Sequence, residues 1–168
     1  MKRIGLFFAL YFAIGIQVSI STPFAQFPWD FDLAFIILVF ATSLFSRSES
    51  LLWAMLGGFM LDIFDPVSLG GHILAKTTVV LIFGLIDDSL NLSRPLLLGI
   101  VLFILSFLDR IIFRLFTPFA IHYGLTLIRF DLPSAVLTAL LGFILLWIAI
   151  KIGLFLPGHY KDSDIAHL

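Results

Sequence analysis

The residues best able to do chemistry are ionisable side chains within apolar stretches, namely Asp62, Lys76, Asp109, Arg110 and Arg114. A charge in hydrocarbon is costly, and in a membrane protein it is by default a candidate functional group. Asp62 lies eleven residues past Leu51, about 16 Å along a helix. That distance predicts a position near the middle of a hydrocarbon layer of about 30 Å.

Asp62 needs a partner if it is buried, and two are available nearby. Lys76 lies in the next apolar run, beyond a short turn that includes Pro66, Leu69, Gly70 and Gly71. A short turn makes the two runs antiparallel neighbours. We therefore predict that Asp62 pairs with Lys76 or accepts hydrogen bonds from the turn amides, since a buried pair costs less than two lone ions. The simpler alternative is a carboxylate at a helix end that reaches the headgroups.

His72 follows the same turn and could relay protons, but a hydrogen-bonded turn histidine is the favoured interpretation. Gly70 and Gly71 allow positive φ in the turn. Gly57 and Gly58 allow a neighbouring backbone to approach closely. We interpret all four glycines as structural, because no phosphate-binding motif surrounds them.

Arg110 and Arg114 are four residues apart and share one helical face, whereas Asp109 is rotated by about 100° from Arg110. Two interpretations stay open. Both arginines reach lipid headgroups, or Asp109 and one arginine form a polar contact with another membrane protein.

No catalytic, cofactor or metal site is predicted. The chain has no Cys, which excludes thiolate chemistry, and its four His are scattered. No nucleophile lies at a recognisable spacing from a general base. The net charge of -1 gives no basic field for nucleic acid. We therefore expect a protein that is not an enzyme and has no cofactor.

Composition predicts an integral membrane protein, since 61% of residues are hydrophobic, 12% are charged and the mean hydropathy is +1.14. A soluble domain carries about 25% charged residues. We predict an all-α, single-domain bundle of six transmembrane helices over residues 1–168. The segments are Ile4–Ile20, Phe31–Phe45, Leu51–Phe64, His72–Ile86, Pro95–Phe116 and Leu132–Ile152.

Three of these segments are short for a span of about 17–25 residues. Leu51–Ile86 could instead form a re-entrant hairpin, which needs protein or water to cover it. With six spans, one side of the membrane receives the basic residues Lys2, Arg3, Arg47, Arg94, Lys151 and Lys161. The positive-inside rule then places both termini in the cytoplasm.

Several surfaces are candidates for partner binding. Ala9 and Ala13 form a small-xxx-small pair that suits helix–helix contact. The connection Thr117–Phe130 is too apolar for a solvated loop, so we expect it to lie in the interface or to dock on a partner. The candidate docking residues are Ala9, Ala13, Asp109, Arg110, Arg114, Phe119, Ile121, Leu125 and Arg129.

The run Asp32–Asp88 resembles the rod shape-determining protein MreD family, whose second span starts with aspartate-leucine, here Asp32-Leu33. The motif is confined to the stretch Gly57–Leu74, GGFMLDIFDPVSLGGHIL. Matching positions are Gly58, Asp62, Leu69, Gly70 and His72. The chain departs from the family pattern at Ser68, where Pro is usual, and at Pro66.

The resemblance implies a non-enzymatic, multi-pass subunit of the bacterial inner membrane that supports peptidoglycan synthesis and rod shape. It implies binding to MreC and, through MreC, to MreB, a RodA-type glycosyltransferase and a penicillin-binding transpeptidase. The six spans and the Ala9/Ala13 pair also resemble the substrate-binding S component of energy-coupling-factor vitamin transporters, which is the alternative. In that case Ala9 and Ala13 would contact the coupling subunit.

Overall fold

The computed structural model describes residues 2–21, 31–42, 44–65, 70–89, 95–116 and 127–151, all of which are helical or in short turns. The predicted all-α class is confirmed for this part of the chain, which contains no strand. The elements are α1 (Lys2–Ser21), α2 (Leu33–Thr42), α3 (Arg47–Phe64), α4 (Gly71–Ser89), α5 (Pro95–Leu115), the π-helical turn η2 (Leu127–Asp131) and α7 (Leu132–Lys151). Pro66, Leu69, Phe119, Ile121 and Leu125 lie outside the described residues.

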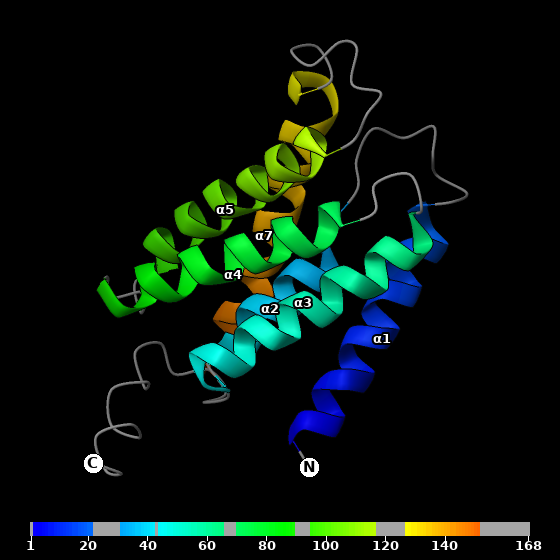
Figure 1. The fold of residues 1–168 in the computed structure, drawn as a ribbon. Helices are drawn as coiled ribbons and strands as arrows, with labels where there is room; N and C mark the ends of the chain where they lie inside the picture. The colour runs from blue at the N-terminus through cyan, green and yellow to red at the C-terminus, as the bar shows by residue number, and fades with distance from the viewer. Residues whose placement is uncertain are drawn as a thin grey trace.

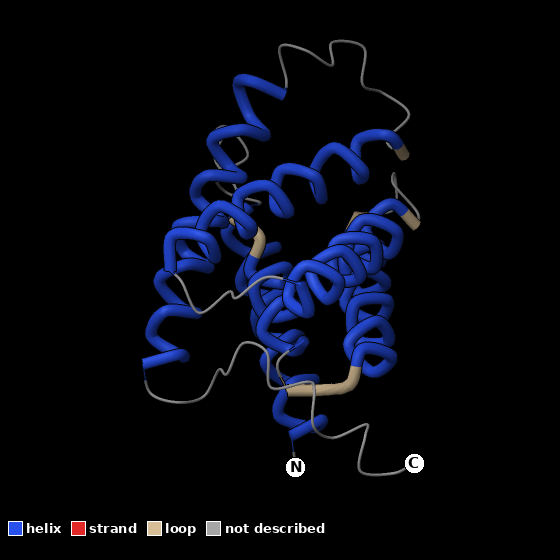
Figure 2. The backbone as a smooth tube through the Cα atoms, turned by 90° about the vertical axis from the view of Figure 1, so that its left-hand side faces the viewer, coloured by secondary structure: helices blue, strands red, loops and turns tan. Residues whose placement is uncertain are grey.

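Helices α3, α4, α5 and α7 pack side by side in chain order, and α1 lies at the edge of the bundle (Figure 1). Hydrogen bonds show that α3 and α4 are antiparallel. Arg47, at the start of α3, donates to the Gly84 carbonyl late in α4. Asp62, near the end of α3, binds the start of α4. Viewed from the side, the described segments are continuous helices with short turns (Figure 2).

The short helix α2 forms the centre of the hydrophobic core. On one side Phe35 and Val39 pack in a buried cluster with Phe83 of α4 and Leu102 of α5. On the other side Leu38 packs with Leu10 of α1 in a second cluster. Because α2 is buried on both sides, it carries apolar residues all round rather than along one stripe.

Several predicted helix ends differ from the structure by one to four residues. Helix α2 ends at Thr42 rather than Phe45, and α3 begins at Arg47 rather than Leu51. The earlier start follows from Ser46, whose hydroxyl accepts a hydrogen bond from the Glu49 amide at 3.4 Å and caps the helix. The other end of α3 is as predicted, at Phe64, two residues after Asp62.

Much of the bundle surface is apolar. Large side chains on α1, α3, α5 and α7 are exposed, with Phe12 at 61% and Ile104 at 55%. Two stretches of the described residues are long and apolar enough to cross a membrane, Lys2–Ile20 and Ile128–Ala149. Helix α5 has 21 residues but carries Asp109, Arg110 and Arg114. This apolar surface agrees with the membrane class that composition predicts.

Candidate functional site

The most strongly charged part of the interior is a cluster of three side chains from three segments, here called the Lys76 cluster: Lys76, Asp32 and Asp109. Lys76 on α4 is only 1% exposed. Its ammonium group donates to Asp109 Oδ2 on α5 at 2.6 Å and also forms an ion pair with Asp32, just before α2. The predicted pairing of Asp62 with Lys76 is therefore wrong.

Charge is balanced around this cluster. Two carboxylates face one ammonium group, and the positive charge of half-buried Arg110 acts on both carboxylates. Asp109 Oδ1 is buried and accepts no hydrogen bond from the described residues. Asp109 is therefore held mainly by its contact with Lys76 and by the surrounding charge. A buried pair of this kind tolerates the loss of one member poorly.

Asp32 has a second task, since it also caps α2. Its Oδ1 accepts a hydrogen bond from the Phe35 amide at 2.8 Å, which is the N-cap arrangement. Its own backbone amide donates to Thr138 Oγ1 of α7 at 3.0 Å. One residue thus connects the start of α2 to α4 through Lys76 and to α7 through Thr138.

Asp62 instead accepts hydrogen bonds from backbone amides, which was the other predicted possibility. Its Oδ1 accepts from the His72 amide at 3.0 Å, and its Oδ2 accepts from the amides of Gly70 at 3.1 Å and Ile73 at 3.3 Å. These amides open α4 and have no partner within that helix. A carboxylate there also complements the helix dipole. Asp62 is thus a buried cap that α3 supplies to α4.

Two glycines make this cap possible. At Gly58, an added Cβ would lie 2.5 Å from the Ile73 Cα, so α3 and α4 can meet this closely only at glycine. Gly70 has a φ of +87°, a left-handed conformation that favours glycine. Gly57 faces the other way, where a Cβ would lie 2.9 Å from a methyl group of Leu10. Close approach at Gly57 and Gly58 and positive φ at Gly70 are as predicted, whereas Gly71 lies in α4 without a positive φ.

His72 and Gly71 connect the cap to α5. The His72 ring stacks on Phe113, with ring centroids 4.1 Å apart and planes at 25°. A Cβ at Gly71 would lie 3.3 Å from the same Phe113 ring. His72 therefore holds a packed position beside the turn, and its backbone amide makes the hydrogen bond to Asp62.

A second ion pair joins α5 to the start of α7. The guanidinium of Arg114 binds Asp131 through two nitrogens, one of them 2.8 Å from Oδ1. Asp131 is 5% exposed. A two-point contact of this kind fixes both position and orientation. The expectation that Arg114 reaches the headgroups is wrong, because its charged group turns inward to Asp131.

The structure divides the predicted docking residues into buried and exposed groups. Asp109 and Ala13 are buried, at 5% and 6% exposure, so neither offers a free surface. The prediction that Asp109 contacts another protein is wrong for this reason. Ala9 and Arg129 are exposed, and Arg129 stacks over the neighbouring Phe130 ring at 5.7 Å.

The sequence analysis did not place Thr138 or Asp131 in the site, and it noted Asp32 only as part of the family resemblance. A signal existed for Asp32, because an aspartate directly before an apolar helix is a typical N-cap. Asp131 precedes Leu132-Pro133, a pattern typical of a helix start. The ionic partners of Asp32 and Asp131 could not be predicted from the sequence, because each partner lies on a different helix.

Comparisons with protein-family models, curated proteins and solved structures give no match to this chain. Lys76, Arg114 and Asp62 each bind carboxylates or backbone amides of another segment, an arrangement that locks the helices in place. No group of three or more potential metal-ligating side chains occurs among the described residues.

Proposed function

We propose that this protein is a six-span bundle of the bacterial inner membrane with both termini in the cytoplasm. Basic residues support this orientation. Arg3 pairs with Glu49, which brings the starts of α1 and α3 together, and Arg47 binds late in α4. Lys76 and Arg114, nearer the opposite end, are paired internally. An excess of Lys and Arg at one end of a bundle favours a cytoplasmic position for that end.

Charge pairing also explains how α3, α4 and α5 can lie in lipid despite their ionisable residues. A paired, hydrogen-bonded charge facing the bundle interior is the form in which membrane proteins retain such groups. The remaining surface of these helices is apolar, with Phe59 at 56% and Ile104 at 55% exposure. Shorter helices such as α2 can be accommodated by local thinning of the bilayer.

Within that architecture, we propose that the protein acts as an MreD-type scaffold in the bacterial cell-elongation complex, binding MreC without catalysing a reaction. One observation carries this proposal. The family-like positions Gly58, Asp62, Gly70 and His72 converge on a single unit, in which the α3 carboxylate caps α4 at a glycine contact. A motif that fixes helix geometry suits a protein whose partners recognise its shape. The vitamin-transporter alternative has no observation of its own in its favour.

Complementation tests this function. The chain is produced in a rod-shaped bacterium depleted of its own MreD, with the cognate MreC supplied alongside. We expect rod shape to be restored and MreC to co-purify from membranes solubilised in mild detergent. Asp62→Ala should reduce both, whereas Asp62→Asn, which keeps an acceptor oxygen, should retain them. Spherical cells with normal amounts of membrane-inserted protein would contradict the scaffold function, and a bound vitamin after purification would favour the transporter.

A further inference from the structure

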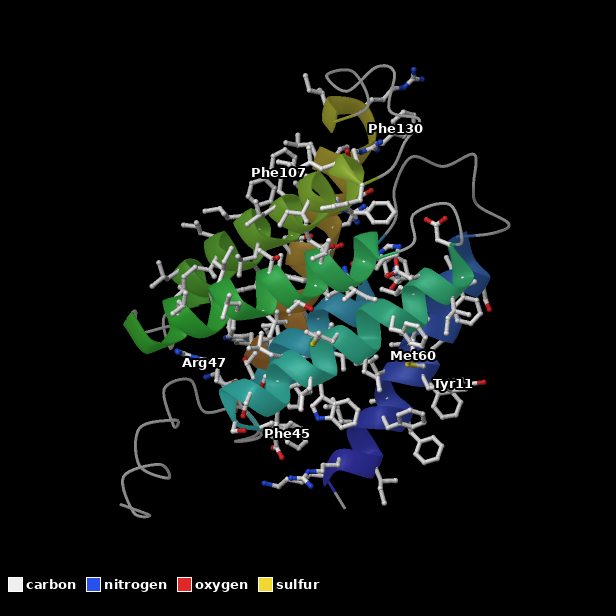
Figure 3. All side chains as sticks on the ribbon, in the orientation of Figure 1. Tyr11, Phe45, Arg47, Met60, Phe107 and Phe130 are labelled. Atoms are coloured by element: carbon white, nitrogen blue, oxygen red, sulfur yellow. The ribbon has the colours of Figure 1, made fainter. Side chains whose placement is uncertain are left out.

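The edge helix α1 carries a groove that the described residues of the bundle do not fill. The groove has a volume of about 430 Å³ and lies between α1 and α3, with Tyr11, Gly15 and Ser19 on one wall and Met60 and Phe64 on the other. Tyr11 points away from the bundle, with Met60 on the neighbouring helix (Figure 3). The groove opens on the surface that faces lipid in the proposed membrane orientation.

Three α1 residues form one continuous stripe along this groove. Tyr11, Gly15 and Ser19 are spaced four residues apart and share a helical face. Nothing lies within 4 Å of a Cβ added at Gly15. Tyr11 is 54% exposed and Ser19 is also exposed. The stripe thus presents a glycine, where another backbone can approach, between two hydroxyl groups.

The depth of Tyr11 indicates what can fill the groove. It is nine residues past Lys2, about 14 Å along the helix, which is near the middle of a hydrocarbon layer of about 30 Å. Its described contact is the edge of the Phe12 ring, at 5.8 Å between centroids. Acyl chains offer no hydrogen-bonding group at that depth, and an unsatisfied hydroxyl there is costly. The occupant must therefore be protein rather than lipid.

We propose that the occupant is the α1 helix of a second copy of this chain, so that the protein forms a two-fold dimer in the membrane. Copies inserted by the same route have the same orientation, so their α1 helices run parallel and each stripe residue meets its own counterpart. Glycine against glycine permits close approach. A hydroxyl both donates and accepts, so it can pair with an identical hydroxyl. The stripe is self-complementary in this sense.

The basic start of α1 does not oppose such a dimer. Lys2 is thirteen residues from Gly15, about 20 Å along the helix. Parallel helices that meet at a small-xxx-small contact cross at about 40°. Their amino-terminal ends therefore diverge from the crossing point, and the two Lys2 side chains stay well apart. Headgroup phosphates and salt also screen them.

Cysteine cross-linking tests the contact directly, because the chain has no Cys of its own. Ser19→Cys is compared with Ile144→Cys, which lies on α7 with 53% of its side chain exposed. In native membranes treated with a mild oxidant, we expect a disulfide-linked dimer from Ser19→Cys and none from Ile144→Cys. Equal dimer yields from both variants would overturn the proposal, because they indicate random collision.

Glycine substitution provides the second measurement. Gly15 and Gly5 are both exposed, and no atom lies within 4 Å of a Cβ added at either, so we expect Gly15→Leu and Gly5→Leu to leave the fold of one copy intact. Gly5 faces a different direction and lies far from the crossing. In lipid nanodiscs analysed by native mass spectrometry, we expect Gly15→Leu to weaken dimerisation about tenfold or more, the effect of losing one or two interhelical contacts. Gly5→Leu should leave it unchanged.

Three results would overturn the proposal: a monomeric wild type, a dimer that survives Gly15→Leu, and occupation of the groove by a helix of another protein. The inference rests on the proposed membrane placement, which alkaline extraction of membranes tests separately. Protein released by alkali contradicts that placement. Protein that stays in the membrane but does not dimerise contradicts only the inference.

Discussion

Removing the Lys76 ammonium group is the strongest single test of the site. Lys76→Met keeps most of the side-chain volume but leaves Asp32 and Asp109 without their shared partner. Breaking a buried ion pair by deleting one member costs about 3–5 kcal/mol. Arg110 still balances one of the two carboxylates. We therefore expect a loss of about 3–5 kcal/mol in the free energy of unfolding, rather than twice that amount.

The double variant Lys76→Met/Asp109→Asn checks the cause of this loss. It removes one positive and one negative charge and leaves Asp32 balanced by Arg110. We expect it to recover about 2 kcal/mol relative to the single variant, since residues in one ion-pair network are coupled by about 0.5–3 kcal/mol.

Equilibrium unfolding in mixed micelles, followed by the emission of the three tryptophans, measures these changes. Lys151→Met is the control, because Lys151 is exposed and contacts only the Trp147 ring among the described residues, at 5.8 Å. Its loss should stay below about 1 kcal/mol. The reasoning is refuted if Lys76→Met behaves like this control, or if the double variant is no more stable than Lys76→Met alone.

Three further changes use the same unfolding assay. Asp62→Ala should cost about 1–2 kcal/mol through the lost cap of α4, and Asp62→Asn clearly less; equal losses would contradict the capping role. Gly58→Ala should cost about 1–3 kcal/mol because its Cβ would meet the Ile73 backbone, while Gly5→Ala, in open space, should not destabilise. A double-mutant cycle on Arg114 and Asp131 should give a coupling of about 0.5–3 kcal/mol, and no coupling would mean that the two-point contact contributes nothing.

The positions of the helices could largely be predicted from hydrophobicity. Apolar runs predicted the positions of all six α-helices because burial in the core and exposure to lipid both select apolar residues. The errors occurred at helix ends, where local caps decide. Ser46 and Glu49 extend α3 by one turn into a polar sequence. A prediction based on apolar runs leaves such a polar turn out of the helix.

The site was only partly predictable, because some of its partners lie far apart in the sequence. Asp62 and its amide partners lie within eleven residues of one another, so a short turn brings them together. Asp32 lies 44 residues from Lys76, and Asp109 lies 33 residues away. Which helices meet depends on packing across α2, and no short-range pattern encodes that. Proximity in sequence therefore suggested Asp62 as the partner of Lys76, whereas the bundle supplies two carboxylates from other helices.

The internal ion pairs limit how a partner protein can recognise this one. Lys76, Asp109 and Arg114 already have ionic partners inside the bundle, so a partner that used them would first have to break a buried pair. In the proposed membrane placement, the described exterior offers instead apolar side chains, small residues and the hydroxyls of α1. Recognition in the membrane should then depend on close packing and hydrogen bonds rather than on charge. A substitution at Gly15 should therefore alter association without altering the fold, whereas one at Lys76 should alter the fold first.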